Sequence, residues 1–192
     1  MSRRQEILDA AQRLFYERGY EAVGVDAIGR EVGIAGPSIY GHFTGKAEIL
    51  AALFDESMDR MLELAGPRRA DPVEQLEHLL RAHARFALDQ RELLTIYTRE
   101  ERSLSDAARR RFRRRERDYL DRWVDPLERL HPDRSRQELV SVSSAVIGLL
   151  MSVTGWPRSA LRTPDLQDLL AGLGRGALDA LSERTESTTF VP

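Results

Sequence analysis

Apolar residues recur at helical spacing through almost the whole chain, and this periodicity constrains the fold more than any other feature. Ile7, Ala11 and Leu14 lie at i, i+4 and i+7, which places them on one face of an amphipathic helix. No segment alternates apolar and polar residues for long enough to indicate a strand. The sequence therefore predicts an all-α protein with about nine helices.

Glycines, prolines and breaks in the periodicity divide the chain into these helices. Gly19 and Gly33 end the first two, because glycine adopts the backbone conformation that closes a helix. Pro37 fits the first turn of the third, where its missing N–H costs nothing. The tail ERTESTTFVP, from residue 183, is expected to be loose. The predicted helices span residues 3–18, 25–32, 36–43, 45–65, 73–88, 91–101, 104–130, 135–154 and 164–182.

Composition excludes several classes of protein. The 192 residues are 42% hydrophobic and 31% charged, which is typical of a folded soluble chain. Cysteine is absent, the four histidines show no metal-ligand spacing, and HExxH, GxSxG and P-loop motifs are missing. We therefore expect no metal, no cofactor and no enzyme activity. The charged start and an apolar run of only nine residues, 145–153, predict a cytoplasmic protein without membrane contact.

Two short helices around a glycine turn, 25–32 and 36–43, form a helix-turn-helix pattern. Ile28 and Val32 on the first are expected to pack against Ile39 and Phe43 on the second, while Gly29 leaves room between them and Gly33 supplies the positive φ of the turn. The outer side of the second helix is then small, polar and uncharged, and it fits a major groove. That side presents Pro37, Ser38, Tyr40, Gly41 and His42.

Lys46 is the only lysine of the chain, and it lies at the start of the next predicted helix. A helix N-terminus favours an anion, and an ammonium adds a full positive charge there. Tyr40, His42 and Thr44 supply further donors nearby, so the group predicts a phosphate clamp that seats the second helix in DNA. The alternative for single residues is structural, with Lys46 solvated on the surface and Tyr40 in the core.

These segments resemble the TetR family of one-component transcriptional regulators. The resemblance is carried by ILDAAQRLFYERGY (7–20), VDAIGREVGI (25–34), PSIYGHFTGK (37–46) and AEILAALF (47–54). It implies a helix-turn-helix DNA-binding domain over 1–48 and a helical effector-binding and dimerisation domain over 49–192. It also implies a homodimer, a palindromic operator in double-stranded DNA, and repression relieved by a small molecule.

By the same resemblance, individual positions receive roles. Tyr40, His42 and Lys46 would hold phosphates, and Gly36, Pro37, Ser38 and Gly41 would lie against base edges. The chain departs from the family pattern at Gly24, Ala35 and Gly45, where hydroxyl side chains are usual. Backbone N–H groups or Thr44 must replace those contacts.

The second helix of the motif contains no Arg, Asn, Gln or Lys, the side chains best suited to reading bases. Residues 1–50 hold six basic and seven acidic residues, so this region is not basic overall. We therefore expect specificity from methyl contacts, from DNA shape, and from Arg3 and Arg4 in a minor groove. A frayed terminus is the alternative for both arginines.

The C-terminal helices suggest subunit contact and ligand binding. Broad apolar stripes over 135–182 predict a homodimer through a four-helix interface, with intrachain packing as the alternative. Seven arginines between 109 and 117 are typical of a solvated face. The predicted effector pocket is lined by His83, Phe86, Tyr97, Phe112, Glu116, Tyr119 and Trp123.

This lining indicates a largely apolar effector with one or two polar handles. A lipid-like molecule or an acyl-CoA fits, because the arginine run could meet its phosphates. His83 and Glu116 can equally be satisfied structural residues, since a buried polar group needs a partner in any fold.

The competing function is a helical adaptor that binds protein and not DNA. The two readings differ in salt dependence, because phosphate contacts release counterions and DNA affinity then falls steeply with added salt.

Overall fold

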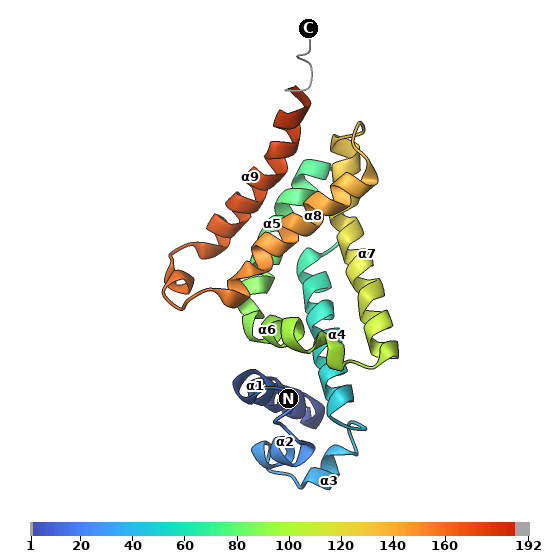
Figure 1. Cartoon of the computed structure of the whole chain (residues 1–192), viewed down its shortest axis with the longest axis vertical. Coiled ribbons are helices and arrows are strands. Elements are labelled where there is room, and N and C mark those ends of the chain that lie inside the picture. The colour runs from blue at the N-terminus through green and yellow to red at the C-terminus, as the bar shows by residue number, and fades with distance from the viewer. Residues whose placement is uncertain (1, 187–192) are drawn as a thin grey trace. The chain divides into compact units, whose positions relative to one another are not determined.

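The computed structural model describes the backbone of residues 2–186 and the side chains of residues 2–181, and every regular element within that range is helical (Figure 1). The nine α-helices of the described residues confirm the all-α prediction. They are α1 (Arg3–Arg18), α2 (Val25–Glu31), α3 (Gly36–Ile39), α4 (Lys46–Ala65), α5 (Pro72–Asp89), α6 (Arg91–Glu100), α7 (Asp106–Leu130), α8 (Arg136–Met151) and α9 (Leu166–Glu186). Three short 3-10 turns lie between them, η1 (Glu101–Ser103), η2 (Ser152–Gly155) and η3 (Ala160–Arg162).

Local signals account for both ends of α1. The Ser2 hydroxyl accepts a hydrogen bond from the Gln5 N–H and caps α1, and Gly19 with φ 83° ends it. Three predicted ends are wrong. The helix α8 stops at Met151 rather than at residue 154, because the 3-10 turn η2 follows it. The helix α3 stops at Ile39 rather than at residue 43, because tighter i to i+3 hydrogen bonds replace the α pattern from Tyr40 to His42. The helix α9 continues to Glu186, and the rest of the tail lies outside the described residues.

The first compact unit contains the residues up to Arg60 together with Gln90–Arg115. In it α1 packs against α2 and α6, and α2 packs against α3. Ile28 and Ile39 are fully buried and Phe43 nearly so, in agreement with the predicted packing between the two short helices. Their burial fixes which side of α3 faces outward.

Several arginines of the run between 109 and 117 bond to other residues of this first unit and do not only face solvent. The Arg111 guanidinium donates to Asp55 at 2.5 Å, and Arg115 bonds the Asp55 carbonyl at 3.2 Å and pairs with Asp59. Arg113 pairs with Glu101 at 2.5 Å. These bonds connect the start of α7 to α4 and to η1.

The second unit contains Met61–Asp89 and the chain from Glu116 onward. In it α5, α8 and α9 pack on one another. At Gly174 α9 lies close to α5, and a Cβ there would lie 2.6 Å from Leu80 Cδ2, the end of a flexible side chain. The predicted domain boundary at residue 48 falls inside α4, while the compact units divide that helix at residue 60. The functional division into 1–48 and 49–192 stays a prediction.

One segment within the described residues, Arg136–Gly155, is long and apolar enough to cross a membrane by length and composition alone. Its mean hydropathy is 1.6, and 28% of the window is buried within this chain. A single helix of this kind is weak evidence for a membrane, since helices of soluble proteins also meet the criterion. An apolar helix with most of its surface uncovered is also what a subunit interface requires.

Candidate DNA-binding surface and effector region

Glycines set the distance between α2 and α3. A Cβ on Gly29 would lie 2.9 Å from the Ile34 carbonyl oxygen and 3.2 Å from Gly36 Cα, so the two backbones meet without a side chain between them. A Cβ on Gly36 would collide with the Asp26 side chain and lie 3.2 Å from its Cα. Gly33, with φ 70°, makes the turn in a region that favours glycine. The predicted roles of Gly29 and Gly33 agree with this geometry.

The outward side of α3 and of the turn that follows it carries no formal charge when His42 is neutral. Tyr40 is 58% exposed, so it is not a core aromatic. Gly36 is half-buried against Asp26 and is less accessible than its neighbours. The exposed residues of this side are Pro37, Ser38, Tyr40, Gly41, His42 and Thr44.

The Lys46 ammonium is held by the turn that follows α1. Its Nζ donates to the Tyr20 carbonyl at 3.0 Å and to the Glu21 carbonyl at 3.4 Å, and it lies 3.6 Å from the Glu21 carboxylate. It also lies 4.3 Å from the centroid of the Tyr20 ring, within the range of a cation–π interaction. The side chain remains 27% exposed. Lys46 is therefore a half-buried residue that joins the start of α4 to Tyr20 and Glu21, and its contact with DNA stays a prediction.

Glu48 is a residue that the sequence reasoning missed. Its carboxylate accepts hydrogen bonds of 2.6 Å from both the backbone N–H and the hydroxyl of Thr44. The hydrogen bond from the Thr44 hydroxyl, and to a smaller extent the one from its backbone N–H, lowers the pKa of Glu48 and keeps the carboxylate ionised. A negative charge consequently occupies the first turn of α4, beside the predicted phosphate clamp. An acidic residue four positions after Thr44, at a helix start, was the available signal.

Arg3 and Arg4 belong to α1 and not to an extended arm. Arg3 pairs with Glu6 and donates to the Val32 carbonyl at 3.2 Å. Arg4 lies 3.3 Å from a Glu56 carboxylate oxygen and 4.6 Å from the centroid of the Phe43 ring. Both side chains are about half exposed. A minor-groove contact would require each to leave these partners.

Carboxylates neutralise most of the cations in this part of the molecule. Arg13 pairs with Glu31 at 2.6 Å, and Arg3, Arg4 and Lys46 have the acidic partners described above. Four of the six basic residues among positions 1–50 are thus compensated within the unit. The surface around α3 has little net positive charge.

The residues predicted to line an effector pocket fall into two clusters. In the first unit Tyr97 and Phe112 pack with Phe54, at ring-centroid distances of 5.2 and 5.9 Å from it. In the second unit His83 lies among Phe86, Tyr119 and Trp123, with centroid distances of 5.7 to 6.0 Å. Glu116 is half-buried at the start of the α7 segment in this second unit. The common pocket stays a prediction.

The cluster around His83 is buried and uncharged. His83 Nδ1 lies 2.9 Å from the Tyr119 hydroxyl oxygen, and burial lowers the pKa of His83 to about 4. Burial also raises the pKa of Tyr119, against the opposing influence of Trp123 and Arg122. Both rings are therefore neutral near pH 7. His83 Nε2 is buried without a hydrogen-bond partner in the described residues, as is Ser143 Oγ on α8.

Within the described residues no group of three or more His, Cys, Asp or Glu side chains is arranged to hold a metal ion.

Comparison with known proteins places the chain in a family. A model described as bacterial regulatory proteins, tetR family, matches residues 7–53, and a model described as tetracyclin repressor-like, C-terminal domain, matches residues 69–160. The first match covers α2, the turn and α3. The two together cover most of the described helices.

Curated relatives include both a transcriptional activator and a transcriptional repressor. The transcriptional activator FasR of Mycolicibacterium smegmatis is 37% identical over 68 residues, which are 35% of this chain and 30% of FasR. The transcriptional repressor KstR2 of Mycobacterium tuberculosis is 30% identical over 131 residues, which are 66% of this chain and 65% of KstR2. The chain thus spans about a third to just under two thirds of the length of these relatives.

Solved structures share the complete fold. The TetR family transcriptional regulator PfmR from Thermus thermophilus superimposes with a TM-score of 0.78 at 24% identity, covering 90% of this chain and 97% of PfmR. AibR, solved in complex with isovaleryl coenzyme A and operator DNA, gives a TM-score of 0.74 at 20% identity, with coverage of 90% and 97%. With both family models and these relatives in agreement, the chain belongs to the TetR family of bacterial regulatory proteins.

Proposed function

We propose that this chain is a ligand-responsive DNA-binding transcriptional regulator, a repressor that a small and largely apolar effector releases from a palindromic operator. One observation carries the proposal. The uncharged outer side of α3 is exposed, and the backbone contact at Gly29 fixes it on α2. A surface of this size and polarity fits a major groove without steric or electrostatic conflict.

The proposed DNA contacts divide into anchoring and reading. Lys46, Tyr40 and His42 anchor phosphates, and Thr44 donates its hydroxyl to a phosphate after exchanging Glu48 as its acceptor. Arg3 and Arg4 are proposed to enter a minor groove after exchanging their present partners for DNA. The residues proposed to face base edges are Gly36, Pro37, Ser38 and Gly41.

The dimer is proposed to form through residues 135–182. On α9, Leu169 and Leu173 are 47% and 50% exposed, although both are large and apolar. The neighbouring exposed positions of α9 and α8 include the small residues Gly172, Gly176, Ala145 and Gly148, which permit close helix contact. Two helices from each subunit would then form a four-helix interface.

The effector is proposed to bind at the cluster of aromatic and polar side chains around His83, on α5 and the second-unit part of α7. His83 Nε2 is a polar atom that no described residue satisfies, and a ligand group can bond to it. Because AibR was solved with isovaleryl coenzyme A, an acyl-CoA or lipid-like molecule is the first class to test. A regulator of this kind works in the cytoplasm, where its operator is.

Selection of duplexes from random DNA, followed by fluorescence anisotropy at several salt concentrations, tests the proposal. We expect a palindromic sequence to be enriched, and its affinity to fall steeply with salt. Ser38→Glu places a carboxylate on the outer side of α3 and should abolish this binding. Ala107→Glu, an exposed position in the first turn of α7, is the matched control and should bind as the parent does. A protein-binding adaptor would enrich no sequence and would show no difference between the two variants.

A further inference from the structure

Exposed large hydrophobic side chains are rare in the described residues, and they gather at three places. Tyr40 lies on the proposed DNA surface, and Leu169 and Leu173 lie on the proposed dimer face. The other two, Val73 at 52% and Leu130 at 38% exposure, belong to neither surface. Both line a single groove in the second unit. Apolar side chains that remain uncovered at a concave site indicate a ligand.

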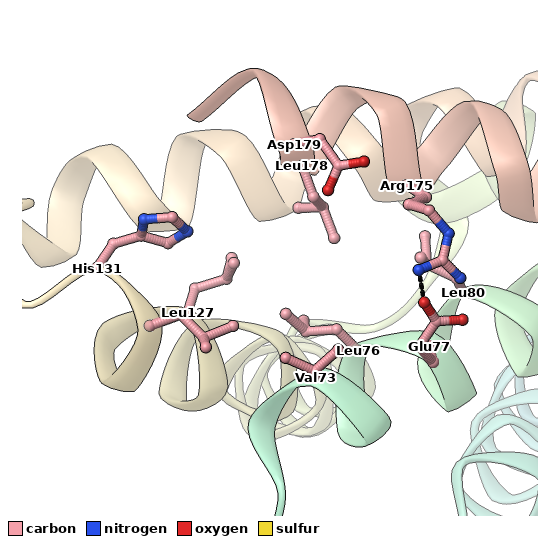
Figure 2. A pocket seen from close by; sticks show the side chains of 10 residues that line it. Val73, Leu76, Glu77, Leu80, Leu127, His131, Arg175, Leu178 and Asp179 are labelled. Carbon is pink, nitrogen blue, oxygen red and sulfur yellow. Dashed lines mark ion pairs between the residues drawn. The ribbon is translucent and has the colours of Figure 1, made fainter. Parts of the chain in front are cut away.

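The groove lies between the start of α5, the end of α7 and the C-terminal half of α9, and its volume is about 260 Å³ (Figure 2). That is about nine times the volume of one water molecule in the liquid. Its apolar wall is formed by Val73, Leu76, Leu80, Leu127, Leu130 and Leu178. The space fits a compact apolar body of a few carbon atoms rather than a long acyl chain.

Packing of α9 on α5 explains where the groove begins. At Gly174 the two helices are in close contact, because a Cβ there would meet Leu80 at 2.6 Å. On the following turn of α9, the side chains of Arg175, Leu178 and Asp179 line the groove (Figure 2). The close contact lies beside Leu80, which lines the groove, and the side chains of the following turn form the rim.

The polar rim of the groove has an excess of negative charge. Arg175 forms an ion pair with Glu77 at one end, so these two charges compensate each other (Figure 2). Asp179 is exposed on the same rim and has no ion-pair or hydrogen-bond partner among the described residues. His131 lies at the opposite end and adds no charge when neutral. An anionic ligand would meet the uncompensated charge of Asp179, whereas a cation would be attracted to it.

We propose that this groove is a binding site for a small apolar amine, with its hydrocarbon part on the leucine wall and its ammonium at the Asp179 carboxylate. The site is separate from the cluster around His83. It is independent of the proposed DNA contacts, which belong to the first unit. A bound amine would contact α9 on the side opposite to Leu169 and Leu173, the exposed leucines of the proposed dimer face.

Three ligands of equal chain length test the charge preference. Isothermal titration of the full chain at pH 8, where imidazole is neutral and alkylamines are charged, compares n-hexylammonium, hexan-1-ol and hexanoate. We expect hexylammonium to bind most tightly and hexanoate least. Asp179→Asn should weaken hexylammonium about fivefold and leave hexanol unchanged. Asp168→Asn, the same exchange at an exposed position of the same helix, should change neither.

Methyl NMR locates the binding. The Leu178 and Val73 methyl resonances should shift with hexylammonium at concentrations where those of Leu8, buried in the first unit, do not. The proposal is overturned if hexanoate binds as tightly as hexylammonium, or if Asp179→Asn and Asp168→Asn have equal effects. Absence of binding by all three ligands at millimolar concentration would also overturn it. Each of these outcomes leaves the proposed DNA-binding function intact.

Discussion

Replacing Lys46 by glutamine separates its structural contact from its proposed contact with DNA. In the free protein Nζ bonds the Tyr20 carbonyl at 3.0 Å, and a glutamine amide can also donate to that oxygen. Lys46→Gln therefore removes the positive charge and keeps a donor. Since the side chain is 27% exposed, the ammonium can also reach outward to a phosphate.

The size of the effect follows from counterion release. One phosphate contact in each subunit gives two in a dimer, and each contributes about 0.9 to the slope of log K against log salt. Lys46→Gln should thus reduce the steepness of that slope by about 1.8. Between 50 and 200 mM salt, the affinity difference between parent and variant should shrink by about 12-fold. Affinity should fall equally for all DNA sequences, because a phosphate contact carries no base information.

Fluorescence anisotropy with the selected operator, at four or more salt concentrations, provides the measurement. Arg13→Gln is the control, because Arg13 pairs with Glu31 and has no proposed DNA contact. It removes the same charge from the same unit and should leave the slope unchanged. If Lys46→Gln and Arg13→Gln both retain the parental slope, the ammonium serves only Tyr20 and Glu21, and the phosphate clamp is wrong.

Three further changes probe other parts of the molecule. Gly29→Ala should displace α3 from α2, because the new Cβ would clash with the Ile34 carbonyl at a cost of about 1 to 3 kcal/mol, offset by about 1 kcal/mol of helix propensity. Operator affinity should fall at least about tenfold. Gly24→Ala is the control and should keep the parental affinity, because no atom lies within 4 Å of its new Cβ. His83 has a folded pKa of about 4, below its unfolded value, so lowering the pH favours the unfolded state, which binds the proton more readily. The parent should lose roughly 2 kcal/mol more than His83→Asn between pH 7 and pH 5 in urea unfolding; equal losses would show that His83 is not buried neutral. Leu173→Lys should convert the proposed dimer into a monomer in analytical ultracentrifugation, and an unchanged sedimentation coefficient would exclude α9 from the interface.

Helix existence was predictable from sequence because it depends on local patterns. Apolar spacing and helix-ending glycines placed all nine helices, and Gly33 marked the turn between α2 and α3. The length of α3 was not predictable in this way. Ile39 and Phe43 keep the i, i+4 spacing of a helix and are both buried, so the apolar pattern does not reveal the tighter hydrogen bonds from Tyr40 to His42.

The sequence analysis mainly failed to predict which groups the charged side chains bond to, because the two partners lie far apart in the sequence. Lys46 meets Tyr20 across 26 residues, and Arg111 meets Asp55 across 56. No periodicity connects such pairs. The predicted effector lining shows the same limit. Phe112 and Tyr119 lie on one apolar stripe of α7, but that helix passes from one compact unit to the other between them.

The groove that is proposed to bind an amine could not be predicted from the sequence, for a different reason. Val73 and Leu130 stand at a helix start and a helix end, where apolar residues fit the core pattern equally well. Only the packing of three helices reveals that both remain exposed. From the sequence alone, Asp179 is likewise an ordinary surface residue, and only the structure shows that it lies on the rim of the groove.

The internal pairing of cations around α3 has a consequence for how the regulator would search a chromosome. Non-specific attraction to duplex DNA comes almost entirely from uncompensated positive charge. With Arg3, Arg4, Arg13 and Lys46 each beside a carboxylate, bulk DNA would retain this protein only briefly. Few copies would be sequestered away from the operator, so a small cellular pool would suffice to keep it occupied.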